Sequence, residues 1–173
     1  STLYAGAQGS GVYKSSDGGV SWNSSGLSGA NIHTIVIDPT TSSILYVGTG
    51  GGGVYRSADN GVSWDASNAG IGSMSVRTLV IDPLTPFSLY AGTSRGVSRS
   101  LDSSANWDDG NRGLSNVSVY SLAIDPAISS TLYAGTSGNG IFKSIDRGEN
   151  WSASSNGLGN QTLNALAIDP LTS

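Results

Sequence analysis

Residues 15–22 of this chain read SSDGGVSW, and residues 57–64 read SADNGVSW. Two less regular copies follow, SLDSSANW at 100–107 and SIDRGENW at 144–151. All four tryptophans of the chain end these copies, at positions 22, 64, 107 and 151, so the steps are 42, 43 and 44 residues. A period of this length in 173 residues predicts four copies of one structural unit.

Two dipeptides repeat with the same period. Leu-Tyr begins at positions 3, 45, 89 and 132, and Asp-Pro begins at positions 38, 82, 125 and 169. We therefore interpret residues 1–173 as a single domain with repeats of about 2–44, 45–88, 89–131 and 132–173.

Each repeat contains four short stretches rich in β-branched and aromatic residues, separated by Gly, Asn, Asp and Ser. No stretch has a sustained helical period. Four strands in about 43 residues are typical of one blade of a β-propeller, whereas a β-solenoid coil is usually shorter. The sequence therefore predicts an all-β propeller of four blades with four antiparallel strands each. The most apolar stretches should line its centre, at 32–37, 76–81, 119–124 and 163–168.

The tryptophan-ending copies resemble the Asp-box, or BNR repeat, with the pattern Ser-x-Asp-x-Gly-x-Thr/Ser-Trp. The copy at 144–151 departs from it at Asn150, and the copy at 100–107 departs at Ser104 and Asn106. Proteins with this repeat include sialidases, xyloglucan-degrading hydrolases, sortilin-type receptors and photosystem assembly factors. The resemblance implies a propeller fold without choosing among these functions.

We interpret the Asp-box residues as structural. The Asp carboxylate can accept backbone N–H groups across a hairpin turn, Gly supplies a positive φ, and Trp packs between blades. The resemblance implies that this motif lies on the face away from the ligand site. Ser104 should weaken the third turn by about 1 kcal/mol if a positive φ is required there. The structural set is Asp17, Gly19, Trp22, Asp59, Gly61, Trp64, Asp102, Trp107, Asp146, Gly148 and Trp151.

Composition excludes several functions. The chain has no Cys, one His and a net charge of -4, which argues against thiolate or multi-histidine metal sites and nucleic-acid binding. Each Asp-box offers one acid, whereas a calcium site gathers several oxygens, so we expect no metal and no cofactor. The sequence contains no run of about 18 apolar residues, which a membrane span would require.

The acidic residues leave little for catalysis. Of 12 acids, four lie in the Asp-boxes and four precede a proline, where they can cap the following turn. The remaining four, Asp65, Asp108, Asp109 and Glu149, lie beside the tryptophan hairpins, whereas a glycosidase needs two carboxyls facing each other across the sugar. We therefore predict that the chain is not an enzyme.

One repeat position varies while its neighbours do not. It holds His33, Arg77, Tyr120 and Asn164, which should converge around the central opening of a ring. These four side chains can hold a small polar ligand or a sugar. The alternative is that they only occupy the wet rim of the channel.

The two chain ends match an internal junction. Joined, they spell AIDPLTS-STLYAG, and residues 123–135 spell AIDPAISSTLYAG. We expect residues 163–168 to complete the N-terminal blade and close a four-blade ring. Two alternatives are an eight-blade ring of two chains and an open head-to-tail polymer. A segment cut from a longer array of these repeats is a further alternative, because its two ends would match an internal junction in the same way.

The predicted function is a non-catalytic scaffold at the cell surface or outside the cell that associates with itself. Low lysine content and the absence of Cys favour that location. The first alternative is a glycan or small-ligand binding module. The second is a fragment of a larger Asp-box glycoside hydrolase.

Overall fold

The computed structural model describes residues 1–170, and the last three residues of the fourth repeat, 171–173, lie outside that part. Residues 1–170 form β-strands and no helix, so none of them belongs to a helix that could cross a membrane. The strands form four antiparallel sheets in chain order. Their bounds are β1 Leu3–Ala7, β2 Gly11–Ser15, β3 Asn23–Ser24, β4 Ile32–Ile37, β5 Leu45–Thr49, β6 Val54–Ser57, β7 Asp65–Ala66, β8 Val76–Ile81, β9 Leu89–Thr93, β10 Gly96–Ser100, β11 Asp108–Asp109, β12 Val119–Ile124, β13 Leu132–Thr136, β14 Ile141–Ser144 and β15 Ser152–Ala153.

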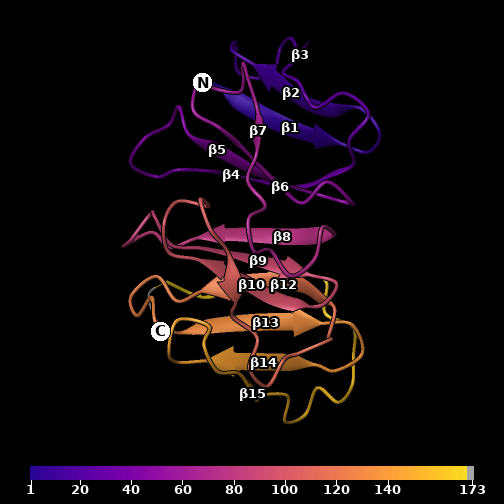
Figure 1. The fold of residues 1–173 in the computed structure, drawn as a ribbon, viewed down its shortest axis with the longest axis vertical. Helices are drawn as coiled ribbons and strands as arrows, with labels where there is room; N and C mark the ends of the chain where they lie inside the picture. The colour runs from indigo at the N-terminus through magenta and orange to yellow at the C-terminus, as the bar shows by residue number, and fades with distance from the viewer. Residues whose placement is uncertain (171–173) are drawn as a thin grey trace.

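The sheets follow one another as blades do in a propeller (Figure 1). Sheet 1 is β1–β3, sheet 2 is β4–β7, sheet 3 is β8–β11 and sheet 4 is β12–β15. The most apolar strands line the inner side of the sheets, where β8 contacts both β4 and β12. An all-β architecture of four antiparallel sheets is thereby confirmed.

In each sheet, the strand next to the inner one contacts a different neighbouring sheet with each of its two faces, because side chains alternate along a strand. In β9, Leu89 and Ala91 pack in one core cluster with Tyr46 of sheet 2. Tyr90 packs in the next cluster with Leu132 and Trp151 of sheet 4. Leu and Ala therefore face the preceding sheet, and Tyr faces the following sheet.

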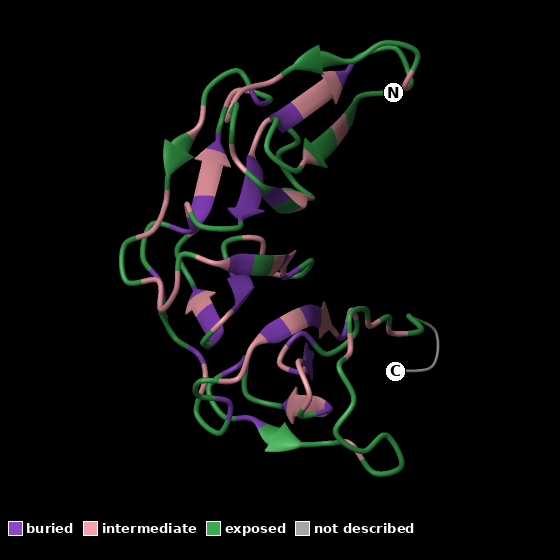
Figure 2. Ribbon diagram, turned by 90° about the vertical axis from the view of Figure 1, so that its right-hand side faces the viewer, coloured by how far each residue is buried: buried purple, intermediate pink, exposed green. Residues whose placement is uncertain are grey.

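The four sheets form an open crescent, with the N-terminus at one side of its opening and the C-terminal segment of the described residues at the other (Figure 2). Sheet 1 has three strands, and within residues 1–170 β1 pairs only with β2. Residues 163–168 form no strand. The prediction that they complete the N-terminal blade within the chain is thus not fulfilled in this structure. A strand needs a hydrogen-bonding neighbour, and β1 lies at the other end of the crescent.

Residues 163–168 nevertheless occupy the position of an inner strand beyond sheet 4. A Cβ added to Gly92 would meet the Val119 side chain at 2.8 Å, and one added to Gly135 would meet Leu163 Cβ at 3.1 Å. Leu163 therefore lies against sheet 4 as Val119 lies against sheet 3. The Leu163 N–H donates to the Thr136 carbonyl at 3.0 Å, which fixes the start of this segment.

Candidate functional site

The Asp-box carboxylates are held inside their own hairpins. The Ser57 hydroxyl donates to Asp59 Oδ1 at 2.8 Å, and the Ser63 N–H donates to the same oxygen at 2.9 Å. The Ser63 hydroxyl donates to Oδ2 at 2.6 Å. These donors, the Ser63 hydroxyl first, lower the pKa of Asp59 to about 2. A carboxylate that is ionised far below neutral pH cannot act as a general acid there.

The two irregular boxes keep this network with different side chains. The Asn106 amide donates to Asp102 Oδ2 at 2.8 Å, and the Asn150 amide does the same to Asp146. Asn thus replaces the donor that Ser supplies in the first two boxes. Sequence reasoning treated both asparagines only as departures from the pattern, although an amide N–H₂ is an obvious substitute for a hydroxyl donor.

The glycine position of the box has a positive φ in every copy. Gly19, Gly61 and Gly148 have φ of 95°, 80° and 77°, and Ser104 has φ of 69° in the third box. Ser104 therefore adopts the left-handed conformation that the sequence predicted to be strained. Its hydroxyl lies 2.7 Å from the Ser67 hydroxyl, so this serine gains an intersheet hydrogen bond that glycine could not make.

Each tryptophan after the first packs against the preceding sheet. The indole N–H donates to a carbonyl there, from Trp107 to Ser67 at 2.8 Å and from Trp151 to Gly110 at 2.8 Å. Trp107 and Trp151 are only 4% and 6% exposed, whereas Trp22 is 41% exposed. Trp22 belongs to sheet 1, which no preceding sheet of this chain covers.

The variable repeat position coincides with a β-bulge in each inner strand. The register shifts between Ile32 and Thr34, between Val76 and Thr78, and between Val119 and Ser121. The extra residue of each bulge is His33, Arg77 or Tyr120. A bulge re-aims its side chain, which explains why this position tolerates different residue types although the residue before it is always Ile or Val.

The structure brings two of the four candidate residues together. The Arg77 guanidinium lies 4.5 Å from the centre of the Tyr120 ring. His33 Nδ1 lies 3.0 Å from the Val76 carbonyl oxygen, so the imidazole of sheet 2 reaches sheet 3 next to Arg77. Within residues 1–170, no hydrogen bond or ring contact joins Asn164 to the other three.

Two of the acids that remained for catalysis form ion pairs. Arg99 contacts Asp108 at 3.2 Å, and Arg112 contacts Glu149 at 3.4 Å across two sheets. Asp65 and Asp109 are exposed at the ends of the hairpins. In the described part of the chain, no three His, Asp or Glu side chains gather as a metal site would require.

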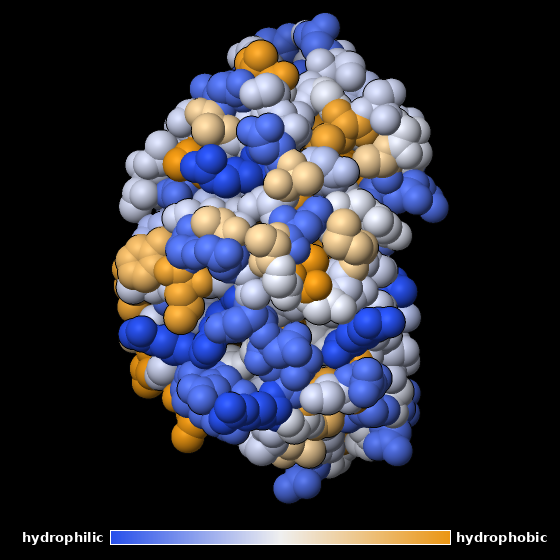
Figure 3. Space-filling model, in the orientation of Figure 1, coloured by the Kyte–Doolittle hydropathy of each residue, from blue (hydrophilic) through white to orange (hydrophobic). Residues whose placement is uncertain are grey.

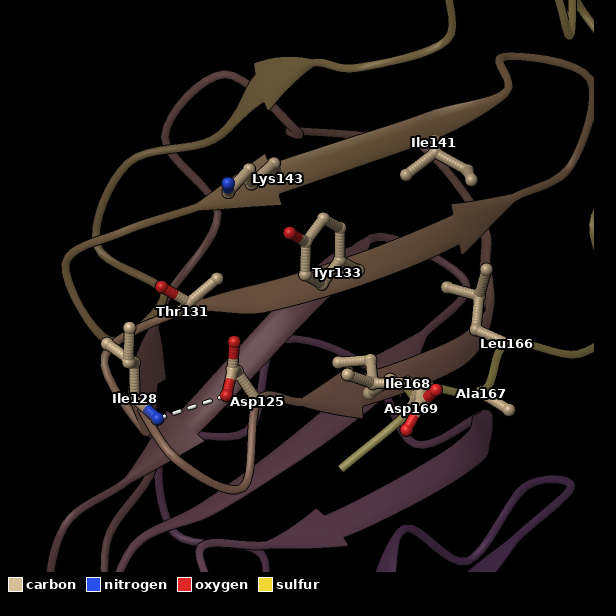
Figure 4. A pocket seen from close by; sticks show the side chains of 11 residues that line it. Asp125, Ile128, Thr131, Tyr133, Ile141, Lys143, Leu166, Ala167, Ile168 and Asp169 are labelled. Atoms are coloured by element: carbon tan, nitrogen blue, oxygen red, sulfur yellow. Dashed lines mark hydrogen bonds between the residues drawn. The ribbon is translucent and has the colours of Figure 1, made fainter. Parts of the chain in front are cut away.

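A cavity of about 530 Å³ lies between the outer face of sheet 4 and the C-terminal segment. Figure 4 shows Tyr133, Ile141 and Lys143 on the sheet, with Leu166 and Ile168 on the segment beside it. Sequence reasoning missed this cavity, although Tyr133 and Ile141 occupy repeat positions that are buried in sheet 3. Elsewhere, hydrophobic side chains are interspersed with hydrophilic ones on the face seen in Figure 3.

Comparisons with known proteins support the fold. No protein-family model and no curated protein matches the chain. Among solved structures, a GH74 enzyme of Niastella koreensis has a TM-score of 0.75 and 18% identity over 88% of this chain and 27% of its own. A GH74 xyloglucanase from Xanthomonas campestris has a TM-score of 0.69 and 19% identity over 87% of this chain and 28% of its own.

A third similar structure is the extracellular domain of a putative hybrid two-component system from B. thetaiotaomicron. It has a TM-score of 0.68 and 21% identity over 94% of this chain and 22% of its own. The chain thus spans about a quarter of the length of these proteins. At such identities the likeness shows a shared propeller-type fold, which enzymes and sensor domains both use.

Proposed function

We propose that this chain is a non-catalytic scaffold module that acts outside the cell and associates with further copies of itself. The observation that carries the proposal is the uncovered outer face of sheet 1. Leu3 and Trp22 are 40% and 41% exposed there, whereas the equivalent Leu132 and Trp151 are 0% and 6% exposed. The leucine is fully buried in the other three repeats and the tryptophan is at least partly buried there, whereas both are surface residues in the first, which is typical of an interaction surface.

The free edge of β1 supports the same proposal. An unpaired strand edge exposes backbone N–H and C=O groups that readily pair with another strand. Residues 163–168 lie beyond sheet 4 without a sheet partner of their own. The two incomplete ends are complementary, because one lacks an inner strand and the other is an inner strand.

A non-catalytic role is supported by the interactions that the carboxylates make. The Asp-box acids are engaged within hairpins, and Asp108 and Glu149 are paired with arginines. An extracellular location is supported by the similar extracellular sensor domain and by the absence of cysteine. A fragment of a GH74-like hydrolase remains the alternative for the same fold.

The scaffold proposal is tested by the molar mass of the chain in solution. Light scattering during gel filtration is expected to give a mass above the 17.5 kDa of one chain, increasing with loading concentration. A constant mass of one chain across the concentration range would contradict the proposal. The chain is used as it stands, so the readout does not depend on any ligand.

Glycan binding is the second candidate function. It is favoured by the bulged residues, where Arg77 stacks on Tyr120 at the inner side of the crescent. If this stack holds a sugar, replacing Tyr120 by Ala should lower the affinity for xyloglucan oligosaccharides at least tenfold in calorimetric titration. Tyr13, which is half-buried on another sheet, supplies a matched Tyr→Ala control. Equal affinities of both variants and the parent chain would exclude this site.

A further inference from the structure

Every internal sheet in this chain is covered by its successor in the same way. The face of sheet 3 that carries Tyr90 and Val97 is buried under Leu132, Ala134 and Trp151 of sheet 4. The face of sheet 2 that carries Tyr46 and Val54 is buried under Leu89, Ala91 and Trp107 of sheet 3. One Leu, one Ala and one Trp from the following sheet thus complete these two interfaces, and Val47 takes the place of the Ala between sheets 1 and 2.

The outer face of sheet 4 presents the same receiving residues without that cover. Tyr133 and Ile141 stand where Tyr90 and Val97 stand in sheet 3, and both line the 530 Å³ cavity. Leu163 of the C-terminal segment lies against Gly135 as Val119 lies against Gly92, and Leu166, the counterpart of Leu122, lines the cavity. Sheet 4 still lacks the cover that a Leu, an Ala and a Trp of the following sheet give to sheets 2 and 3.

The binding position for that tryptophan is already formed. In the interfaces between sheets 2 and 3 and between sheets 3 and 4 it follows the last strand of the earlier sheet, at 67–70 and at 110–113, and we call it the tryptophan site. A Cβ added to Gly70 or Gly113 would overlap the backbone carbonyl of Trp107 or Trp151. The corresponding Gly157 has φ of +88°, close to the +86° of Gly113. A Cβ there would meet no described atom within 4 Å.

Backbone hydrogen bonds confirm that the fourth tryptophan site, residues 154–157, has the shape of the others. The Ser154 N–H donates to the Ile141 carbonyl at 2.8 Å, as Ser67 does to Val54 at 2.9 Å. The Ser154 carbonyl therefore stands where the Ser67 carbonyl accepts the Trp107 indole. Unlike its counterparts, this site has no tryptophan of the described chain above it.

The missing residues are present at the other end of the chain. Leu3, Ala5 and Trp22 are the sheet 1 equivalents of Leu132, Ala134 and Trp151, and all three are exposed. The turn of sheet 1 is also open, since a Cβ at Gly19 would meet only Leu3. At the equivalent Gly148 it would meet the Tyr90 ring of the preceding sheet at 3.2 Å.

Resting on the proposed self-association, we propose that two copies of this chain close head to tail into one ring of eight sheets. Sheet 1 of each copy covers sheet 4 of the other, and Trp22 enters the tryptophan site at 154–157, donating to the Ser154 carbonyl. Residues 163–168 add to β1 of the other copy as its missing inner strand. Each copy contributes one head and one tail, so both junctions are alike and no surface is left open.

The internal sheets define the contacts at this junction. Tyr4 Oη and Lys14 Nζ both donate to the Asn60 carbonyl at 3.0 Å, in the Asp-box turn of the following sheet. Tyr133 and Lys143 are their counterparts in sheet 4, and the Lys143 ammonium lies 5.3 Å from the Tyr133 ring as Lys14 does from Tyr4 at 5.5 Å. Their acceptor in the second copy is the carbonyl of Gly18, the counterpart of Asn60.

The register of the added strand follows from β4 and β5. Ile35 pairs with Val47 there, and Asp38 N donates to Ile44 O, so Ile35 and Val47 form a non-hydrogen-bonded pair. The corresponding pair at the junction is Leu166 with Ala5. Non-hydrogen-bonded partners have Cα atoms about 4.5 Å apart, which is within the range of a disulfide.

A cysteine cross-link tests this register, because the chain has no native cysteine. The double variant Ala5→Cys/Leu166→Cys, mildly oxidised, is expected to migrate at twice the mass of one chain on a non-reducing gel. Ala5→Cys/Ala167→Cys is the matched control, since a one-residue slip places the sulfurs on opposite faces. The control is expected to remain largely uncross-linked.

Each other outcome overturns the two-copy ring in a distinguishable way. A cross-linked species of one-chain mass would show closure within the chain, and a ladder of masses would show an open polymer. No cross-link, together with a solution mass of two chains, would place self-association on another surface and leave the proposed function standing. No cross-link and a one-chain mass would overturn both proposals.

A second variant tests the tryptophan site without touching the strands. Gly157→Ala places a Cβ where Trp22 of the second copy would lie, and it is expected to lower the apparent association constant at least tenfold. Gly29→Ala is the matched control, because Gly29 has φ of +85° and also has no described atom within 4 Å of an added Cβ. Equal weakening by both variants would show backbone strain and would contradict a role for this site.

Discussion

Replacing Trp107 with alanine is expected to lower the free energy of unfolding by about 3–5 kcal/mol, the usual cost of deleting a buried tryptophan. The indole is 4% exposed, fills the interface between sheets 2 and 3, and donates to the Ser67 carbonyl. Its loss leaves a cavity and an unpaired carbonyl together. Urea denaturation followed by circular dichroism measures the change.

Trp22→Ala is the matched control for this prediction. Trp22 belongs to the same motif, but it is 41% exposed because sheet 1 is not covered. At protein concentrations where the chain is monomeric, this variant should change the free energy of unfolding by about 0.5 kcal/mol or less. Equal destabilisation by both substitutions would mean that Trp22 is buried within the single chain, as in a closed four-blade ring.

Gly113→Ala should be the second strongly destabilising substitution, by about 2–4 kcal/mol. Gly113 has φ of +86°, and an added Cβ would overlap the Trp151 carbonyl, so strain and steric overlap act together. The overlap is with backbone and cannot be relieved by a side-chain rotation. The free energy of unfolding from urea titration measures the effect.

Gly157→Ala separates the two causes. Gly157 has nearly the same φ but no described atom near an added Cβ, so the monomer should lose only the strain of about 1–2 kcal/mol. A loss equal to that of Gly113→Ala would mean that the fourth tryptophan site is already filled within one chain. The comparison therefore reports directly on the open outer face of sheet 4.

The repeat made most of the fold predictable from the sequence. The period of Trp22 and its counterparts, together with the strand-like runs, predicted four antiparallel sheets, and the structure contains them. The Asp-Pro turns were also anticipated, since Asp82 Oδ1 accepts the Leu84 N–H at 2.8 Å. Local patterns of this kind are decided within one repeat, so a single sequence suffices for them.

Features that depend on neighbouring sheets were not predictable from local sequence. SSDGGVSW and SADNGVSW look equivalent, yet their tryptophans differ in exposure because only Trp64 has a preceding sheet to pack against. Residues 163–168 have the composition of an inner strand but form none, because β1 is not beside them. The bulges at Arg77 and Tyr120 were also not predicted, although the buried apolar residues around each, such as Val76 and Leu79, are three positions apart instead of two.

The central claim is that the uncovered face of sheet 1 joins copies of this chain. Light scattering of the parent chain and of Trp22→Ala at equal concentrations tests it most directly, with exposed Val20→Ala as the control. We predict twice the 17.5 kDa of one chain for the parent and for Val20→Ala, and a shift to one-chain mass for Trp22→Ala. A one-chain mass for all three, or the same assembly for all three, would contradict the claim.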